Sequence, residues 1–204
     1  MARPSNTAQR RREITAGLQR VMAQNGYDGA SIADVARAAR LTPGLVHYHF
    51  RSKLEILQAL LGELGESHLS ALDAALGSAS SDPERALDIF IDRHLATGRS
   101  ANPEQLACWI AIGAEAIREP AVREPYQAIL EALTKRLEAI VKRGVAAGVF
   151  TSRSPRSAAV AILAVIQGYF GIAGAARSLI PAHSAAPQVK AMARGLLAPR
   201  KKPA

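Results

Sequence analysis

A signal for the start of a helix recurs along the chain. A residue with a capping side chain stands directly before a proline at Thr42-Pro43, Asp82-Pro83, Asn102-Pro103 and Ser154-Pro155. Such a side chain accepts a hydrogen bond from the free amides of a helix start, and proline fits the first helical position because no amide donor is needed there. No run of alternating β-branched residues bounded by turns competes with this pattern. The sequence therefore predicts an all-α protein.

Joining these starts to the apolar periodicity predicts about nine helices. The expected ranges are 7–24, 32–39, 43–49, 53–76, 83–97, 103–118, 121–147, 155–177 and 187–197. We expect the first three helices to form a helix-turn-helix domain over residues 1–52. A larger helical domain for ligand binding and dimerisation would follow over residues 53–198, and residues 199–204 would form a basic tail.

The formal net charge of +9 is unevenly distributed. Residues 1–56 carry nine Lys or Arg against four Asp or Glu, residues 57–189 carry twelve against thirteen, and residues 190–204 carry five against none. Basic patches favour nucleic acid or an anionic membrane surface, although an ordinary solvated surface has the same composition.

The sequence carries few features that indicate the cellular compartment of the protein. The single cysteine, Cys108, excludes an intramolecular disulfide framework. The N-terminus lacks the apolar segment of a signal peptide, and the closest candidate for a membrane span, residues 158–176, is rich in Gly and Ala and contains Gln167. These observations predict a cytoplasmic protein with no membrane partner.

Residues 41–53, LTPGLVHYHFRSK, bring two histidines and a tyrosine together near the end of the third expected helix. Because His47 and His49 are two positions apart, a helix places them about 200° apart, so they cannot readily bind one metal ion. No nearby Cys, Asp or Glu completes a ligand set, and no Ser, Cys or Asp stands at helical spacing to form a nucleophile and base pair. The segment predicts no metal site, catalytic residue or cofactor.

The remaining interpretation of this segment is contact with DNA. The first turn of the expected helix can enter the major groove, where Gly44 would let the backbone approach closely. His47 and Tyr48 can donate hydrogen bonds to phosphates or base edges, and Lys53 would add its charge to the free amides of the next helix start. Whether His47 and His49 contact DNA or pack in the core stays open at this point.

A longer pattern surrounds this segment. Residues 12–61 resemble, without a gap, the N-terminal domain of the TetR family of bacterial transcriptional regulators. The positions that carry the resemblance are Gly26, Tyr27, Ser31, Ile32, Ala33, Asp34, Val35, Ala36, Ala39, Thr42, Gly44, Phe50, Ser52, Lys53 and Leu57. Two positions depart from the family pattern, because Arg40 stands where a turn glycine is usual and His47 where a tyrosine is common.

The resemblance implies two kinds of DNA contact. Phosphate contacts would come from Ser31, His47, Tyr48 and Lys53. Base-edge contacts would come from Thr42, Pro43, Gly44 and Leu45. Arg10 or Arg11 is a candidate for an additional contact with the DNA backbone. Because few bidentate base readers lie in the third helix, specificity is expected to depend on thymine methyl groups and DNA shape.

We call the expected helix-turn-helix domain the head of the chain. A dimer would let two heads bind the two halves of a palindromic double-stranded operator. The segment 157–180 is apolar almost all round, which is unusual for a surface helix of a monomer. Small residues on it would allow close approach of a second helix, although a central core helix has the same composition. The interface candidates are Ala161, Ala164, Gly168, Gly171, Ala175 and Met192.

A small-molecule effector would bind among the middle helices. A cavity lined by aromatic side chains with a few polar groups suits such a ligand, although ordinary core packing explains each residue alone. The candidates are Phe90, His94, Cys108, Trp109, Glu115 and Tyr126.

These features favour a sequence-specific transcriptional regulator, in particular a repressor released by an effector. A sequence-tolerant architectural DNA-binding protein is the alternative, but it would not need so large a helical body. A small all-α enzyme is disfavoured because no paired carboxylates, Gly-rich phosphate loop or triad spacing is present.

Overall fold

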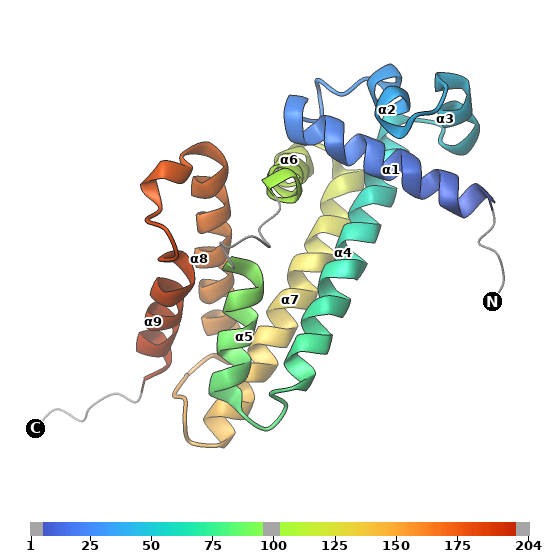
Figure 1. The fold of residues 1–204 in the computed structure, drawn as a ribbon. Coiled ribbons are helices and arrows are strands. Elements are labelled where there is room, and N and C mark those ends of the chain that lie inside the picture. The colour runs from blue at the N-terminus through green and yellow to red at the C-terminus, as the bar shows by residue number, and fades with distance from the viewer. Residues whose placement is uncertain (1–5, 96–102, 199–204) are drawn as a thin grey trace, which may run out of the picture. The chain divides into compact units, whose positions relative to one another are not determined.

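A computed structural model describes residues 6–95 and 103–198, and within these ranges the chain forms helices and no strand. The predicted all-α fold is therefore confirmed (Figure 1). The α-helices of the described residues are α1 (Asn6–Asn25), α2 (Ile32–Ala39), α3 (Pro43–His49), α4 (Lys53–Gly77), α5 (Pro83–Leu95), α6 (Pro103–Arg118), α7 (Pro120–Ala146), α8 (Pro155–Ala175) and α9 (Ala185–Leu197).

The proline-based helix starts are confirmed. The helices α3, α5, α6 and α8 each begin at their proline. The Thr42 hydroxyl accepts a hydrogen bond from the Leu45 amide at 3.3 Å, and the Ser154 hydroxyl accepts one from Ser157 at the same distance. Asn102, the expected cap of α6, and Thr97, the expected end of α5, lie outside the described residues, as does the basic tail 199–204.

Two expected boundaries near the C-terminus are wrong by two residues. The helix α8 ends at Ala175, and a short 3-10 turn over Arg177–Leu179 follows it. The helix α9 begins at Ala185 rather than at Pro187. Proline is tolerated as the third helical residue because the first-turn amides have no partner within the helix.

The described residues form two compact units, which we call unit 1 and unit 2. Among the described residues, unit 1 comprises 6–66 and 103–128, and unit 2 comprises 67–95 and 129–198. The helices α4 and α7 each contribute their first part to unit 1 and their second part to unit 2. The division into a DNA-binding domain over 1–52 and an effector domain over 53–198 is a functional one and stays a prediction.

The helix α1 supports the rest of the N-terminal head in unit 1. Its Ile14 and Leu18 side chains are completely buried, and Val35 of α2 and Val46 of α3 are buried with no exposed surface. A glycine allows α1 and α2 to meet, since a Cβ atom on Gly17 would lie 2.8 Å from the Val35 carbonyl oxygen. A small apolar core therefore holds the three short helices, as the sequence predicted.

The helix α7 contains a proline in its second turn, and α4 compensates for it. Pro125 has no amide hydrogen, so the Ala121 carbonyl cannot receive the usual hydrogen bond from four residues later. The Gln58 side-chain amide donates to this carbonyl at 3.0 Å. A hydrogen bond to the carbonyl that Pro125 leaves free thus joins α4 and α7 within unit 1.

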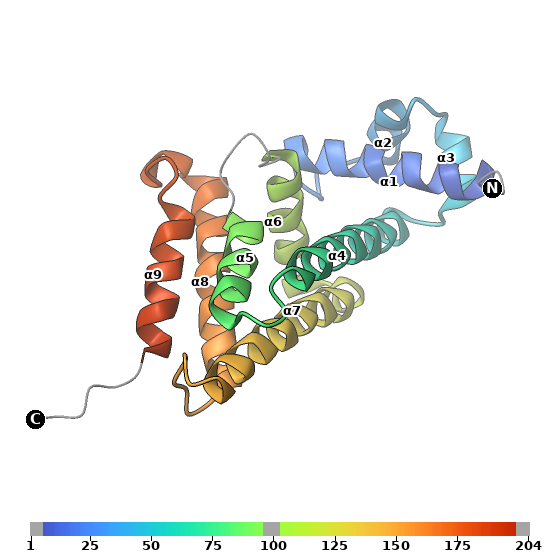
Figure 2. The same cartoon turned by 60° about the horizontal axis from the view of Figure 1, so that its bottom comes forward.

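Unit 2 is built around α5, α8 and α9, which lie side by side (Figures 1 and 2). The contact faces are apolar and buried, with Phe90 and Ile91 on α5, Ile162 and Ile166 on α8, and Val189 on α9. Burial of these side chains is the main source of stability for the unit.

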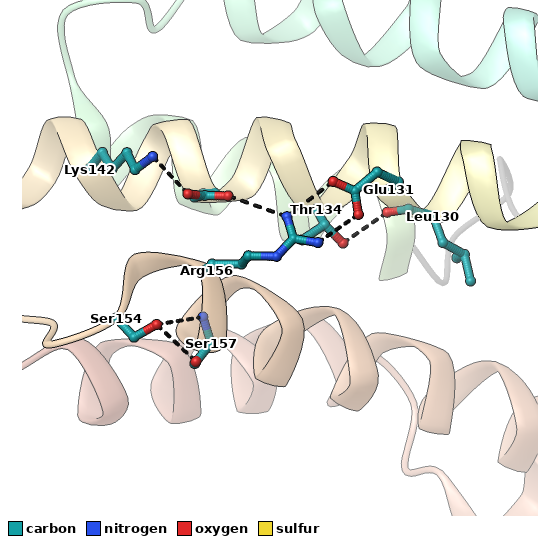
Figure 3. A network of polar contacts seen from close by, with 8 residues as sticks. Leu130, Glu131, Thr134, Lys142, Ser154, Arg156 and Ser157 are labelled. Atoms are coloured by element: carbon teal, nitrogen blue, oxygen red, sulfur yellow. Dashed lines mark hydrogen bonds and ion pairs between the residues drawn. The ribbon is translucent and has the colours of Figure 1, made fainter.

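Ion pairs join α7 and α8 on the surface of unit 2. Arg156 at the start of α8 pairs with Glu131 of α7 through two hydrogen bonds of 3.0 and 2.7 Å (Figure 3). The same guanidinium lies 3.6 Å from a Glu138 oxygen, which Lys142 approaches to 2.7 Å. Because the Arg156 and Glu131 side chains are 52% and 40% exposed, this network adds little to stability.

Candidate nucleic-acid interface

The first turn of α3 is fixed in place by its neighbours. The Thr42 side chain caps the helix, Pro43 occupies its first position, and the Phe50 amide closes its end by donating to the Val46 carbonyl at 2.9 Å. Val46 and Phe50 are buried against α1 and α2. The helix therefore presents its remaining side chains from a rigid support.

The predicted DNA-contacting residues on α3 are mostly exposed. Thr42, Pro43, Gly44 and His47 lie on the surface, and Leu45 is partly buried. The Tyr48 side chain is 81% exposed, which is unusual for an aromatic residue on a packed helix. A Cβ atom on Gly44 would meet nothing within 4 Å, so the backbone is open to a partner there.

The two histidines of this segment have different environments. His47 is exposed, whereas His49 is partly buried and meets the Tyr48 ring edge-on with 5.0 Å between ring centres. The backbone carbonyl of His49 accepts a hydrogen bond from Arg11 of α1. The structure therefore leaves His47 available to a partner and uses His49 partly for packing.

The turn between α2 and α3 has a left-handed residue. Arg40 ends α2 with φ 58° and ψ 39°, and its amide donates to the carbonyls of Ala36 and Arg37. For a residue with a Cβ atom this conformation costs roughly 1–2 kcal/mol. The structure thus shows a left-handed arginine at the position where the family usually has a turn glycine.

Five basic residues of the three N-terminal helices and the start of α4 have partners within unit 1. The Arg11 guanidinium lies 3.8 Å from the centre of the Phe50 ring, and Lys53 donates to the Tyr27 carbonyl at 2.8 Å. Arg10 and Arg37 form ion pairs with Glu13 and Asp34 on their own helices, each at 2.7 Å. Arg20 donates to the Ala38 carbonyl. The sequence does not distinguish Arg11, Arg20 and Lys53 from free cations, because only the tertiary structure brings their partners near.

Lys53 and Ser31 illustrate how a predicted phosphate contact can also have a structural role. The Lys53 amino group lies 4.3 Å from the centre of the Tyr27 ring in addition to its hydrogen bond, so it fastens α4 to the turn before α2. Ser31 caps α2 in a reciprocal pair with Asp34, and these hydrogen bonds, together with that from Arg37, lower the pKa of the Asp34 carboxyl. Their contacts with DNA remain predictions.

Three arginines of the head have exposed side chains with no such partner. Arg12, Arg40 and Arg51 make no side-chain hydrogen bond, ion pair or ring contact with any residue that the structure describes. Solvated cations of this kind retain the whole of their charge for an external anion. Contacts of these three arginines with DNA are a prediction.

The predicted effector residues divide between the two units. Cys108, Trp109, Glu115 and Tyr126 belong to unit 1, where the Trp109 and Tyr126 ring centres are 6.4 Å apart. Burial raises the pKa of the Cys108 thiol to about 12, so this residue packs as a neutral side chain. Glu115 pairs with Arg118 at 3.0 Å. A common pocket with the two predicted residues of unit 2 stays a prediction.

Those two residues, Phe90 and His94, stack on each other with 4.5 Å between ring centres. The His94 Nδ1 atom lies 2.7 Å from the Phe90 carbonyl, and its Nε2 atom lies 3.0 Å from Nε2 of His68, a partner that the sequence did not indicate. Desolvation lowers the pKa of His94 to about 4. Desolvation also lowers the pKa of His68, and the positive charges of Arg93 and Arg136 lower it further. Both imidazoles are neutral at pH 7, with His94 donating to Phe90 and accepting from His68.

Five of the six predicted dimer residues share one face of α8, and the sixth, Met192, lies on α9. Ala161, Ala164, Gly168, Gly171 and Ala175 are spaced by three or four positions, and all are exposed in the single chain. Val160 and Ile172 on the same helix are 47% and 45% exposed, and Met192 of α9 is 55% exposed. By length and composition α8 could also cross a membrane, but its opposite face, with Ile162 and Ile166, is part of the core of unit 2.

Comparison with known families agrees with this geometry. Residues 14–60 match the family model for bacterial regulatory proteins of the tetR family. Residues 83–198, more than half of the chain, match the model for the C-terminal part of BetI-type transcriptional repressors. The chain belongs to the TetR family. Its resemblance to that family, first seen in residues 12–61, is thereby confirmed and extended to the larger helical region.

Individual relatives match this TetR-family protein over part of their length. The HTH-type transcriptional regulator BetI of Rhizobium meliloti is 30% identical over 118 residues, which cover 56% of this chain and 55% of the relative. The HTH-type transcriptional regulator TtgR of Pseudomonas putida is 33% identical over 73 residues, which cover 36% of this chain and 35% of the relative. The chain thus spans about half or less of the curated relatives that it matches.

Solved structures share the fold over nearly the whole chain. A TetR-family regulator from Agrobacterium tumefaciens has a TM-score of 0.80 at 20% identity and covers 95% of this chain and 100% of its own. A protein of Saccharomonospora viridis, described as a transcriptional regulator in complex with choline, has a TM-score of 0.79 at 20% identity and covers 92% of this chain and 95% of its own. Identities this low support the fold and nothing beyond it.

Proposed function

We propose that this TetR-family protein is a transcriptional repressor that binds a palindromic operator as a homodimer and leaves it when a small molecule binds. The observation that carries the proposal is the exposed first turn of α3 on a rigid, buried support. Thr42, Pro43 and Gly44 offer a narrow, uncharged edge for the major groove, and His47 and Tyr48 offer donors beside it. The repressor would act in the cytoplasm and would need no cofactor.

The exposed small-residue face of α8 supports the dimer. A face of alanine and glycine allows two helix backbones to approach closely, and the flanking Val160 and Ile172 would lose their contact with water in the process. A cyclic dimer formed in this way would present two heads to two half-sites. This arrangement explains why so apolar a helix has one face with nothing packed against it among the described residues.

Choline is the first effector to test, because a structural neighbour from Saccharomonospora viridis was solved with it. Aromatic faces attract quaternary ammonium groups, and Trp109 and Tyr126 bring two aromatic rings together in unit 1. Release of operator DNA by choline at millimolar or lower concentration would support this ligand. Unchanged binding would exclude choline and direct the search to other small molecules, leaving the DNA-binding proposal unaffected.

The proposal makes a sharp prediction for Gly44. Its Cβ position is open, so Gly44→Leu should fold and still place a large side chain where the groove must approach. Gly62 of α4 provides a matched control, because it is also helical and has nothing within 4 Å of its Cβ position. Fluorescence anisotropy with a labelled duplex from upstream of the protein's own gene measures the effect.

We expect Gly44→Leu to lose binding to this duplex by at least about tenfold, since close backbone approach in a groove has no room for a leucine. Gly62→Leu should bind like the wild type. If the Gly44 variant folds and binds with unchanged affinity, then α3 does not enter the groove by its first turn, and the proposed interface is wrong.

A further inference from the structure

The turn between α2 and α3 contains a strained residue. Arg40 has φ 58°, a backbone conformation that glycine adopts freely and that a residue with a Cβ atom adopts only at a cost. The turn itself needs only the backbone of this residue, whose amide donates to the Arg37 carbonyl at 3.1 Å. Any other benefit of an arginine at this position must therefore come from its side chain.

No described part of the protein supplies that benefit. The Arg40 side chain is exposed and makes no hydrogen bond, ion pair or ring contact with another described residue. Arg37 on the preceding turn is paired with Asp34, and Arg11 is stacked on Phe50. Arg40 thus combines a strained backbone with an unpaired guanidinium, and strain of this kind is concentrated at functional sites.

The position of the turn indicates the partner. Arg40 precedes Thr42, the cap of α3, by two residues, so it stands beside the helix end that the proposed function places in the major groove. The edges of that groove are lined by phosphates, and most hydrogen bonds between proteins and DNA go to phosphate and sugar. A guanidinium is always charged and can bind a phosphate through two parallel hydrogen bonds.

We propose that Arg40 binds a DNA phosphate at the edge of the groove that α3 enters, and that this contact offsets the strain of its left-handed backbone. The inference rests on the proposed function. It adds to the contact set a residue that sequence resemblance cannot supply, because the family usually has a glycine there. It also predicts that folding stability and DNA affinity respond in opposite directions to one substitution.

The test uses two variants that remove the charge. Arg40→Gly removes both the charge and the strain, and Arg40→Asn removes the charge while keeping a side chain that tolerates the left-handed region. Arg153→Gln in unit 2, also exposed and without a side-chain partner among the described residues, is the matched control for loss of one positive charge. Dissociation constants are measured against salt concentration for the upstream duplex and for a random duplex of equal length.

Loss of one phosphate contact lowers the slope of log K against log salt by about 0.9 per protomer, or about 1.8 for a dimer with two heads bound. We expect this decrease for both Arg40 variants and none for Arg153→Gln. We also expect Arg40→Gly to raise the midpoint of thermal unfolding. A wild-type slope in both Arg40 variants would overturn the proposal and make Arg40 an ordinary solvated arginine.

This outcome can be told apart from failure of the proposed function. If the wild-type protein binds both duplexes equally, sequence-specific repression is refuted at the fragment tested. The Arg40 contact is still decided in that case, because a phosphate contact does not depend on sequence and the random duplex shows the same change in slope.

Discussion

The pair of part-buried imidazoles in unit 2, His68 and His94, predicts that the protein loses stability in mild acid. The folded-state pKa of His94 is about 4, below its ordinary value of 6.5, chiefly because burial disfavours the charged ring. Between these two values the unfolded chain binds a proton that the folded chain does not. Stability is therefore greatest above the unfolded-state pKa and falls as the pH falls towards the folded-state pKa.

The magnitude follows from the two pKa values. At about pH 5, linkage gives a loss of about 2 kcal/mol in the free energy of unfolding from His94 alone, relative to neutral pH. This is a large part of the stability of an ordinary domain. The positive charges of Arg93 and Arg136, which face the pair, also lower the pKa of His68. Protonation of His68 therefore also lowers stability in acid and does not offset the effect of His94.

Urea unfolding followed by circular dichroism at about pH 7 and about pH 5 tests this prediction. In His94→Phe, which keeps an aromatic ring against Phe90, the loss between the two pH values should be smaller than in the wild type by about 2 kcal/mol. Ile91→Val is the control, because it destabilises the same core by about 0.5–1.5 kcal/mol while keeping the histidine. If His94→Phe keeps the full pH dependence, burial of this imidazole is not its cause.

Three further predictions concern packing. Gly17→Ala should destabilise unit 1 by about 1–3 kcal/mol in urea unfolding, because its Cβ would lie 2.8 Å from a carbonyl of α2, and wild-type stability would contradict this close packing. Gln58→Leu should cost about 1 kcal/mol, and less in a Pro125→Ala background where Ala121 regains its helical donor; an equal cost in both backgrounds would refute the compensation. Gly168→Leu should shift sedimentation from dimer towards monomer, and an unchanged dimer would exclude this face from the interface.

Local signals account for the parts of the fold that the sequence predicted well. The bounds of α2, α3 and α6 agree with expectation because a proline or a serine cap at the start and a turn at the end act within a few residues. The end of α8 was missed because the residue after it is Ala176 and not a capping glycine, whereas Gly171 and Gly174 lie inside the helix.

The exposed face of α3 could also be predicted, since the apolar periodicity of the first helices determines which side chains are buried. Which basic residues have a partner within the protein could not be predicted. Whether Arg11, Lys53 or Arg40 is free depends on which carbonyl, ring or carboxylate the tertiary structure brings near each one. The same limit applies to His68 and His94, which are 26 positions apart and meet only because α4 and α5 pack together.

Sequence-specific repression is best tested by the ratio of two dissociation constants, for DNA upstream of the protein's own gene and for random DNA of equal length, at one physiological salt concentration. We expect tighter binding to the upstream DNA by a factor of about 10³ or more, as for a protein that distinguishes base sequence. Equal constants for the two duplexes would show a head that binds phosphates without distinguishing sequence, and would contradict the proposed repressor.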